Sequence, residues 1–163
     1  MPPFRPALLL KVAAVSLLAL AAGCGSSAPP SMTGTWTFYA ISSLVPSEPP
    51  KTLSGTLTSN GDAVTGTLTF SNSCFSGQKL KFSGAIGTDN LVTLNSKQQV
   101  YNNQIVYLAG TIASDGSLLT AGSYTVAASD TTKPICDTGD AGSLTGSRTS
   151  TSTVVTKAAV DAP

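Results

Sequence analysis

The sequence predicts an all-β domain, an eight-stranded antiparallel up-and-down meander that closes, or nearly closes, into a barrel. Three observations favour this fold class. Apolar and polar residues alternate with period two from Thr33 to about Arg148, turn-forming residues separate the alternating segments, and glycine recurs on the apolar side of the strands. A closed barrel leaves no strand with an unpaired edge. A two-sheet β-sandwich would show the same alternation and is the main alternative.

Each alternating segment predicts a strand that is buried on one face and wet on the other. The eight segments are Thr35–Ile41, Thr52–Ser59, Ala63–Ser71, Lys79–Gly87, Leu91–Ser96, Gln104–Ala113, Leu119–Ala127 and Ser143–Arg148. The inner face is expected to include Phe38, Leu57, Leu68, Phe70, Phe82, Ile86, Leu94, Leu108, Ile112, Tyr124 and Leu144. Tyr39 and Tyr107 have the opposite parity and are expected on the outer face.

The connections between strands carry residues that tolerate positive φ. Asn60-Gly61, Asp89-Asn90 and Asp115-Gly116 each fit a tight hairpin turn. The segment 55–61 also recurs in similar form as 110–116. This alignment extends to Gly66 and Gly122 only if one residue is inserted near Ala121, which predicts a β-bulge there.

Six strands carry a glycine on the face expected to be buried. These glycines are Gly55, Gly66, Gly84, Gly110, Gly122 and Gly146. A glycine inside a strand marks a bend or a close approach of another chain segment. Their repetition therefore favours a strongly curved, closed sheet.

Composition excludes several classes of function. Nine basic residues stand against eight acidic ones, so the net charge is +1 and there is no overall excess for a nucleic acid to recognise. The chain contains no histidine, the commonest general base and metal ligand. Without histidine or a Ser-x-x-Lys arrangement, none of the many hydroxyls is expected to be activated. The sequence therefore predicts a protein that is not an enzyme and uses no cofactor.

The carboxylates lie mostly beside glycine, asparagine, serine or threonine, where they usually form Asx-turns. The only candidate pair of acids is Asp137 and Asp140, in a glycine-containing loop. Such a pair could bind Ca²⁺, but the ligand spacing of an EF-hand is absent. No metal site is therefore predicted.

Residues 1–23 are typical of a secretory signal peptide. Arg5 and Lys11 supply the positive start, and the apolar stretch from Val12 to Ala22 is about half the length needed to span a bilayer. The ending Leu20-Ala21-Ala22-Gly23-Cys24 resembles the lipobox of bacterial lipoproteins. This resemblance implies that Cys24 carries a lipid and anchors the protein to the cell envelope. In bacterial lipoproteins, an Asp directly after the lipidated Cys implies retention in the inner membrane. This chain has Gly25 at that position, so the resemblance favours the outer membrane.

The remaining cysteines, Cys74 and Cys136, form an even pair in an oxidising compartment. A disulfide between them is the simplest expectation. The predicted organisation is a signal peptide (1–23), a lipidated Cys24 with a flexible tether (24–32), a β-barrel (33–148) and a disordered Ser/Thr-rich tail (149–163).

Gly34-Thr35-Trp36 begins the first predicted strand, and Arg148 ends the last. This pattern resembles the calycins, the group that includes lipocalins, fatty-acid-binding proteins and avidins. In calycins a Gly-x-Trp lies at the barrel bottom and a late arginine stacks over the tryptophan. The resemblance implies that Trp36 and Arg148 close one end of the barrel. The alternative is that Trp36 is an ordinary core aromatic.

Two functional hypotheses follow, and neither involves nucleic acid. By resemblance to calycins, the domain is a binding module for a small apolar ligand or an envelope component. The candidate ligand-facing interior residues are then Phe38, Leu57, Leu68, Phe82, Leu108 and Tyr124. The alternative is a structural or interaction lipoprotein with a packed core and no ligand, because eight strands enclose a space that side chains can just fill.

Overall fold

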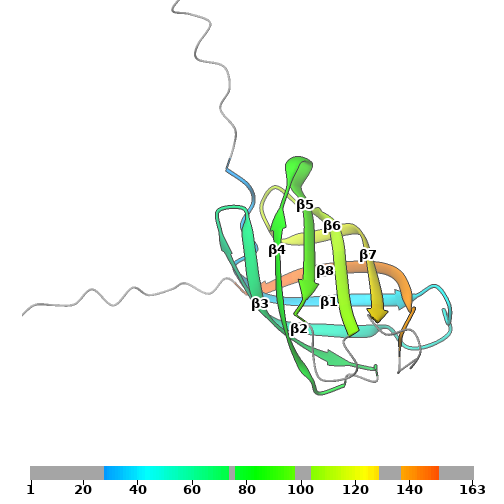
Figure 1. The fold of residues 1–163 in the computed structure, drawn as a ribbon. Coiled ribbons are helices and arrows are strands. Elements are labelled where there is room, and N and C mark those ends of the chain that lie inside the picture. The colour runs from blue at the N-terminus through cyan, green and yellow to red at the C-terminus, as the bar shows by residue number, and fades with distance from the viewer. Residues whose placement is uncertain (1–27, 74–75, 98–103, 129–136, 151–163) are drawn as a thin grey trace, which may run out of the picture.

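The chain forms a closed, eight-stranded antiparallel barrel, which confirms the predicted fold class. A computed structural model describes residues 28–73, 76–97, 104–128 and 137–150. The strands are β1 (Gly34–Ser42), β2 (Lys51–Asn60), β3 (Ala63–Ser71), β4 (Lys79–Ile86), β5 (Leu91–Ser96), β6 (Gln104–Ile112), β7 (Leu118–Ala128) and β8 (Ala141–Ser150). Each strand pairs with its neighbours in chain order, and β8 pairs back onto β1 (Figure 1). The sandwich alternative is therefore wrong.

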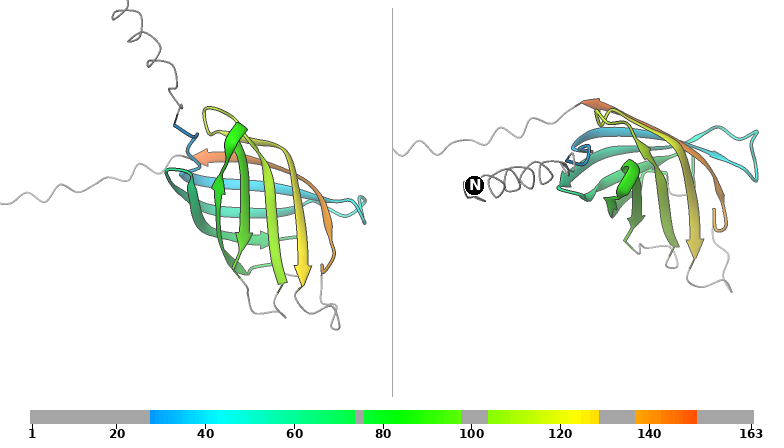
Figure 2. Two further views of the ribbon diagram at one scale, coloured as in Figure 1. Left: turned by 45° about the horizontal axis from the view of Figure 1, so that its top comes forward. Right: turned by 90° about the horizontal axis from the view of Figure 1, so that it is seen from above.

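Pairing of β1 with β8 closes the barrel between the two ends of the described chain. The register runs from Thr35 opposite Ser150 to Ser42 opposite Gly142, with one irregularity between Thr35 and Trp36. Figure 2 shows the two strands lying side by side. β8 begins two residues before the predicted start and continues two residues beyond Arg148. Within the described residues, no helix is long and apolar enough to cross a membrane.

The two ends of the barrel differ in their connections. One end, called here the tight-turn end, carries the short connections 61–62, 87–90 and 113–117. β1 begins and β8 ends at this end, so the described chain enters and leaves the barrel there. The opposite, long-loop end carries the connections 43–50, 72–78, 97–103 and 129–140. Long connections on a rigid scaffold are where binding groups usually lie.

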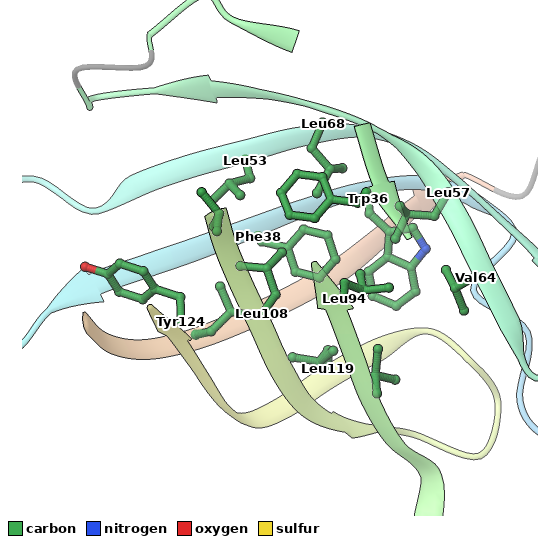
Figure 3. Close-up of a cluster of buried hydrophobic side chains, with 14 of the residues drawn as sticks. Trp36, Phe38, Leu53, Leu57, Val64, Leu68, Leu94, Leu108, Leu119 and Tyr124 are labelled. Carbon is green, nitrogen blue, oxygen red and sulfur yellow. The ribbon is translucent and has the colours of Figure 1, made fainter. Parts of the chain in front are cut away.

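The interior is a single cluster of buried apolar side chains. All eleven residues expected on the inner face belong to it, together with Met32, Trp36 and others. Trp36 and Phe38 stack with ring centroids 5.5 Å apart and planes 9° apart (Figure 3). Tyr39 and Tyr107 are 48% and 41% exposed, which confirms the predicted outer face.

The predicted turns and bulge are also present. Gly61, Asp89, Asn90 and Gly116 have φ between 56° and 69°. At Ala121 φ is 48°, and the pairing of β7 with β8 shifts register between Leu119 and Gly122. The one-residue insertion in the internal repeat is therefore a β-bulge, as the sequence indicated.

The strand glycines allow close approach of neighbouring segments. A Cβ atom at Gly84 would overlap the carbonyl oxygen of Thr93 on β5. A Cβ atom at Gly146 would overlap the ring of Phe38, which lies against that glycine. These two positions show the close approach expected from the sequence, of a neighbouring strand at Gly84 and of a core ring at Gly146.

Replacing Gly84 by alanine is expected to lower the free energy of unfolding by about 1–3 kcal/mol, because the backbone of β4 or β5 must move. Urea unfolding followed by tryptophan fluorescence measures this change. Gly87→Ala is the matched control, since its Cβ atom would meet only the Leu91 carbonyl oxygen, at 3.6 Å. Equal stability of the two variants would contradict the proposed close approach.

Candidate functional site

A lysine is buried inside the barrel at its long-loop end. Lys51 is the first residue of β2, and it has the same parity as Leu53 and Leu57, whose side chains are in the core. The strand therefore directs its side chain inwards, where the residue is only 5% exposed. A buried ammonium group needs compensating charge, because desolvation disfavours the charged form.

Three carboxylates from the long-loop end compensate the charge of Lys51. The Nζ atom lies 2.8 Å from Oδ2 of Asp140, 3.8 Å from Oδ1 of Asp137 and 3.9 Å from Oε2 of Glu48. The side chain of Asp140 is 8% exposed, that of Asp137 19% and that of Glu48 57%. Only the contact with Asp140 is therefore both short and buried.

Asp140 also accepts hydrogen bonds from two other strands. The hydroxyl of Ser42, the last residue of β1, donates to Oδ1 at 2.6 Å. The hydroxyl of Tyr124, on β7, donates to Oδ2 at 2.7 Å. Figure 3 shows this hydroxyl pointing away from Trp36. One carboxylate thus joins β1, β2 and β7 at the start of β8.

The local backbone holds both Asp140 and Ser42 in place. Asp140 follows a turn in which Asp137 and Gly139 have φ of 60° and 82°, and its amide donates to the Asp137 carbonyl at 2.9 Å. The Ser42 hydroxyl accepts from the amides of Leu44 and Val45, at 3.2 and 3.1 Å, which begin the β1–β2 connection. The network therefore fixes two of the long connections to the barrel.

The surroundings keep each group in its ordinary charge state. Burial would raise the pKa of Asp140, but the hydrogen bonds from Lys51, Ser42 and Tyr124 outweigh it and hold the pKa below 3.8. Burial would lower the pKa of Lys51, but the bond to Asp140 and the three negative charges raise it above 10.5. Burial, together with the bond to Asp140, raises the pKa of Tyr124. At neutral pH the site contains a carboxylate, an ammonium and a phenol.

A cavity of about 200 Å³ opens over this network. Its lining residues are Ser42, Leu44, Val45, Glu48, Lys51, Asp137, Thr138 and Asp140. One ammonium and three carboxylates give the lining a net charge of −2, and Leu44 and Val45 supply an apolar wall. The volume is below the usual 300–1,000 Å³ of a drug-sized site, so only a small group fits.

The structure brings together Asp137 and Asp140, the pair singled out from the sequence. The group between them is the ammonium of Lys51. The ammonium lies between the two carboxylates and Glu48, in the place that a bound cation would take. Within the described part of the chain, no group of three or more acidic or other ligating side chains is arranged to hold a metal ion. The pair therefore forms part of an internal salt-bridge network.

Trp36 and Arg148 lie opposite each other in the β1–β8 register, at the tight-turn end. The Trp36 ring nitrogen donates to the Met32 carbonyl at 2.7 Å. The Arg148 guanidinium donates to the carbonyls of Ser31 at 3.1 Å, Thr33 at 3.4 Å and Asp115 at 3.0 Å. These bonds hold the chain before β1 against the barrel end.

The six candidate ligand-facing residues Phe38, Leu57, Leu68, Phe82, Leu108 and Tyr124 are all in the buried core cluster. Tyr124 alone among them reaches the polar network. Cys24, Cys74 and Cys136 lie outside the described residues, so the lipid anchor and the disulfide stay predictions.

Lys51, Ser42 and Glu48 were not predicted as site residues from the sequence. Lys51 carries a usable signal, because its parity places it on the inner face with Leu53 and Leu57. An ionisable residue in that position requires an internal partner. The identity of the partner could not be inferred, since Asp140 lies far away in the chain.

Replacing Asp140 by asparagine is expected to lower the free energy of unfolding at pH 7 by about 2–3 kcal/mol, because Lys51 loses its one close, buried counter-charge. Urea unfolding measures the difference. Asp62→Asn is the matched control, since Asp62 is exposed in the turn between β2 and β3. A loss no larger than that of the control would show that Asp140 does not stabilise the barrel.

The effect of Asp140 should depend on pH in a defined direction. Its pKa is lowered from 3.8, so its contribution to stability is complete above about pH 4 and is lost as the pH falls through the lowered value. The pKa of Lys51 is raised from 10.5, so its contribution persists up to about that pH and is lost above it. The stability difference between wild type and Asp140→Asn should therefore stay constant from about pH 5 to pH 9 and shrink in acid. A difference that changes steadily between pH 5 and pH 9, measured by urea unfolding, would contradict this assignment.

Comparison with known proteins adds no relative from which a role could be transferred. The chain matches no family model, no curated protein and no solved structure. What can be inferred of its function therefore comes from the contacts and charges described above.

Proposed function

We propose that the protein is an exported, lipid-anchored envelope protein that binds a small polar or amphipathic group at the long-loop end of its barrel. The observation that carries the proposal is the separation of the two barrel ends. The chain enters and leaves at the tight-turn end, whereas the cavity and the four long connections lie at the other. An anchor at Cys24 then leaves the cavity facing away from the membrane.

The length of the tether supports this orientation. Met32 is fully buried, and Arg148 and Trp36 bond to the carbonyls of Ser31 and Met32. Ser31 is the seventh residue after Cys24, so the two are separated by a span of about 25 Å at most. The tight-turn end is thus held near the proposed anchor. The absence of an Asp after Cys24 supports an outer-membrane address.

The packing of the core favours a site at the barrel end over one inside. Trp36, Phe38 and Phe82 occupy the interior, each no more than 2% exposed. An apolar ligand inside the barrel would have to displace such rings from close-packed positions, at a cost of several kcal/mol. The geometry therefore supports the interaction lipoprotein with a packed core better than an interior carrier.

The proposed role is binding and involves no catalysis. Asp140, Lys51 and Tyr124 hold one another in their ordinary charge states, with the pKa values of the acid and the base moved away from neutrality. A general acid or base would instead need a pKa near the working pH. Such a network positions groups without exchanging protons.

A Cys74–Cys136 disulfide is part of the proposal. Asn72, two residues before Cys74, donates to the Pro50 carbonyl at 3.2 Å. Asp137, directly after Cys136, lies 3.8 Å from the Lys51 ammonium. The described neighbours of both cysteines thus contact consecutive residues at the long-loop end. A bond there would stabilise the fold by about 4 kcal/mol in the chain-entropy model.

Native mass spectrometry of the protein purified from its own envelope in a neutral detergent tests this function. We expect a mass increase for the lipid on Cys24 and a non-covalent adduct. The disulfide should lower the mass by two hydrogen atoms relative to the reduced chain. Val45→Trp, which places a larger side chain in the cavity, should abolish binding of the adduct. Leu91→Trp, an equivalent exposed position at the tight-turn end, should keep it.

The outcomes separate the parts of the proposal. A wild-type protein without an adduct would overturn ligand binding and leave a structural lipoprotein with a packed core. An adduct retained by Val45→Trp would place the ligand elsewhere than in the cavity. An unmodified Cys24 would overturn the lipid anchor.

A further inference from the structure

Three exposed lysines lie together on the outer wall of the barrel. Lys79 and Lys81 are on β4, and Lys97 directly follows β5. The two strands lie side by side on one wall (Figure 1). All three side chains are exposed and have the parity opposite to that of the buried residues Leu80, Phe82 and Ser96. We call these three residues, with the neighbouring Thr67 and Thr69, the lysine face.

The register of β4 and β5 brings these lysines close together. Phe82 pairs with Ser96, and the amide of Lys97 donates to the carbonyl of Lys81 at 2.8 Å, so Lys97 lies directly beside Lys81. Side chains in such positions have Cβ atoms about 5 Å apart, and like charges there repel. Lys79 follows on the same face about 7 Å along the strand.

Within the part of the chain that the structure describes, carboxylates do not offset this charge. Glu48, Asp137 and Asp140 surround Lys51, and all the ion pairs among the described residues involve that lysine. Asp62, Asp89 and Asp115 are in the turns of the tight-turn end, far from Lys79 along the strands. Among the described residues, positive and negative charges are therefore separated, and the positive charge on this wall has no carboxylate beside it.

The neighbours of the lysines are short hydroxyl side chains. Thr67 pairs with Lys81 and Thr69 with Lys79 in the β3–β4 register, and both threonines are partly exposed on the outer face. The lysine face thus combines three ammonium groups with hydroxyls that donate and accept hydrogen bonds. This chemistry suits a polymer that carries both negative charges and hydroxyl groups.

We propose that the lysine face binds an anionic polysaccharide of the cell envelope, a glycan with carboxylates on successive sugars. Charge complementarity would provide attraction and orientation, and the threonines would contact sugar hydroxyls. This site is distinct from the cavity at the long-loop end and would act alongside it.

The position of the lysine face favours a glycan over the phospholipid headgroups of the anchoring membrane. Lys79 starts β4 at the long-loop end, and the eight residues of that strand span about 26 Å towards the tight-turn end. The screening length at physiological salt is about 8 Å. If Cys24 anchors the protein as proposed, the bilayer surface is therefore too far from the lysine face for electrostatic attraction. Only the choice of a glycan over these headgroups rests on the proposed function.

Binding of the full chain, in a neutral detergent, to immobilised polygalacturonate tests the proposal, with dextran as the neutral polymer. The variant Lys79→Gln/Lys81→Gln/Lys97→Gln is expected to bind at least about tenfold more weakly at low salt. The slope of log affinity against log salt should fall by about 2, at roughly 0.7 for each lost contact with a flexible polyanion. Unchanged affinity or equal binding to dextran would overturn the proposal.

A charge-relocated variant provides the matched control. It adds Thr111→Lys, Thr125→Lys and Thr145→Lys, on the outer faces of β6, β7 and β8, to the triple glutamine variant. Net charge is then restored while the lysine face stays neutral. We expect binding to remain weak. Recovery of wild-type affinity would show that net charge alone drives capture and would overturn the proposed site.

Two further arms separate this inference from the proposed function. Val45→Trp should leave polygalacturonate binding unchanged, and the triple glutamine variant should keep the adduct of the cavity, so either proposal can fail alone. Anionic phospholipid added to the micelles should compete only weakly. Complete displacement of the glycan by that lipid would identify a headgroup site and overturn the choice of polysaccharide.

Discussion

Closure of the barrel by β1 and β8 is the constraint on which the other features depend. These strands come from opposite ends of the described chain, and a polar cluster reinforces the contact at each end of their shared edge. At one end Arg148 on β8 bonds to the carbonyls of Ser31 and Thr33, before β1. At the other end Ser42 of β1 bonds to Asp140, directly before β8. Since a closed sheet has no free edge, these contacts protect the one pairing that separates a barrel from an open, aggregation-prone meander.

The buried Lys51–Asp140 pair explains how the long-loop end keeps its shape. Desolvating an ion pair offsets much of its attraction, so such a pair contributes less to stability than to the choice of one arrangement. Here the carboxylate has three donors, from Lys51, Ser42 and Tyr124, and each comes from a different strand. Any other position of Asp140 would leave Lys51 without its one close, buried counter-charge. The apolar core needs no ion pair to fix its arrangement. Its shape follows from the packing of large residues against small ones, such as Phe38 against Gly146.

Features that depend on local parity could be predicted from the sequence, and those that depend on contacts between distant residues could not. The inner residues, the turns at Gly61 and Gly116 and the bulge at Ala121 all follow from alternation or from the internal repeat. The polar network was missed because Ser42 and Asp140 are 98 residues apart, and no local pattern links them. Lys51 was passed over because a charged residue at a strand end is ordinarily exposed. The lysine face is an intermediate case: parity places each lysine outside, but only the register places Lys97 beside Lys81.

The lysine face also differs from the rest of the outer wall in a way that solubility does not explain. Most outward positions hold serine or threonine, which keep a strand soluble and favour its geometry without any repulsion. Three more hydroxyls at positions 79, 81 and 97 would do the same, and scattered lysines would supply charge at less cost. Adjacent like charges instead weaken the pairing of β4 with β5, which is a short pairing of five residue pairs. The closed barrel tolerates this local cost because both strands are also held by their other neighbours, β3 and β6. An arrangement that costs stability and gives no more solubility than scattered lysines would give is accounted for most simply by a partner that supplies negative charge.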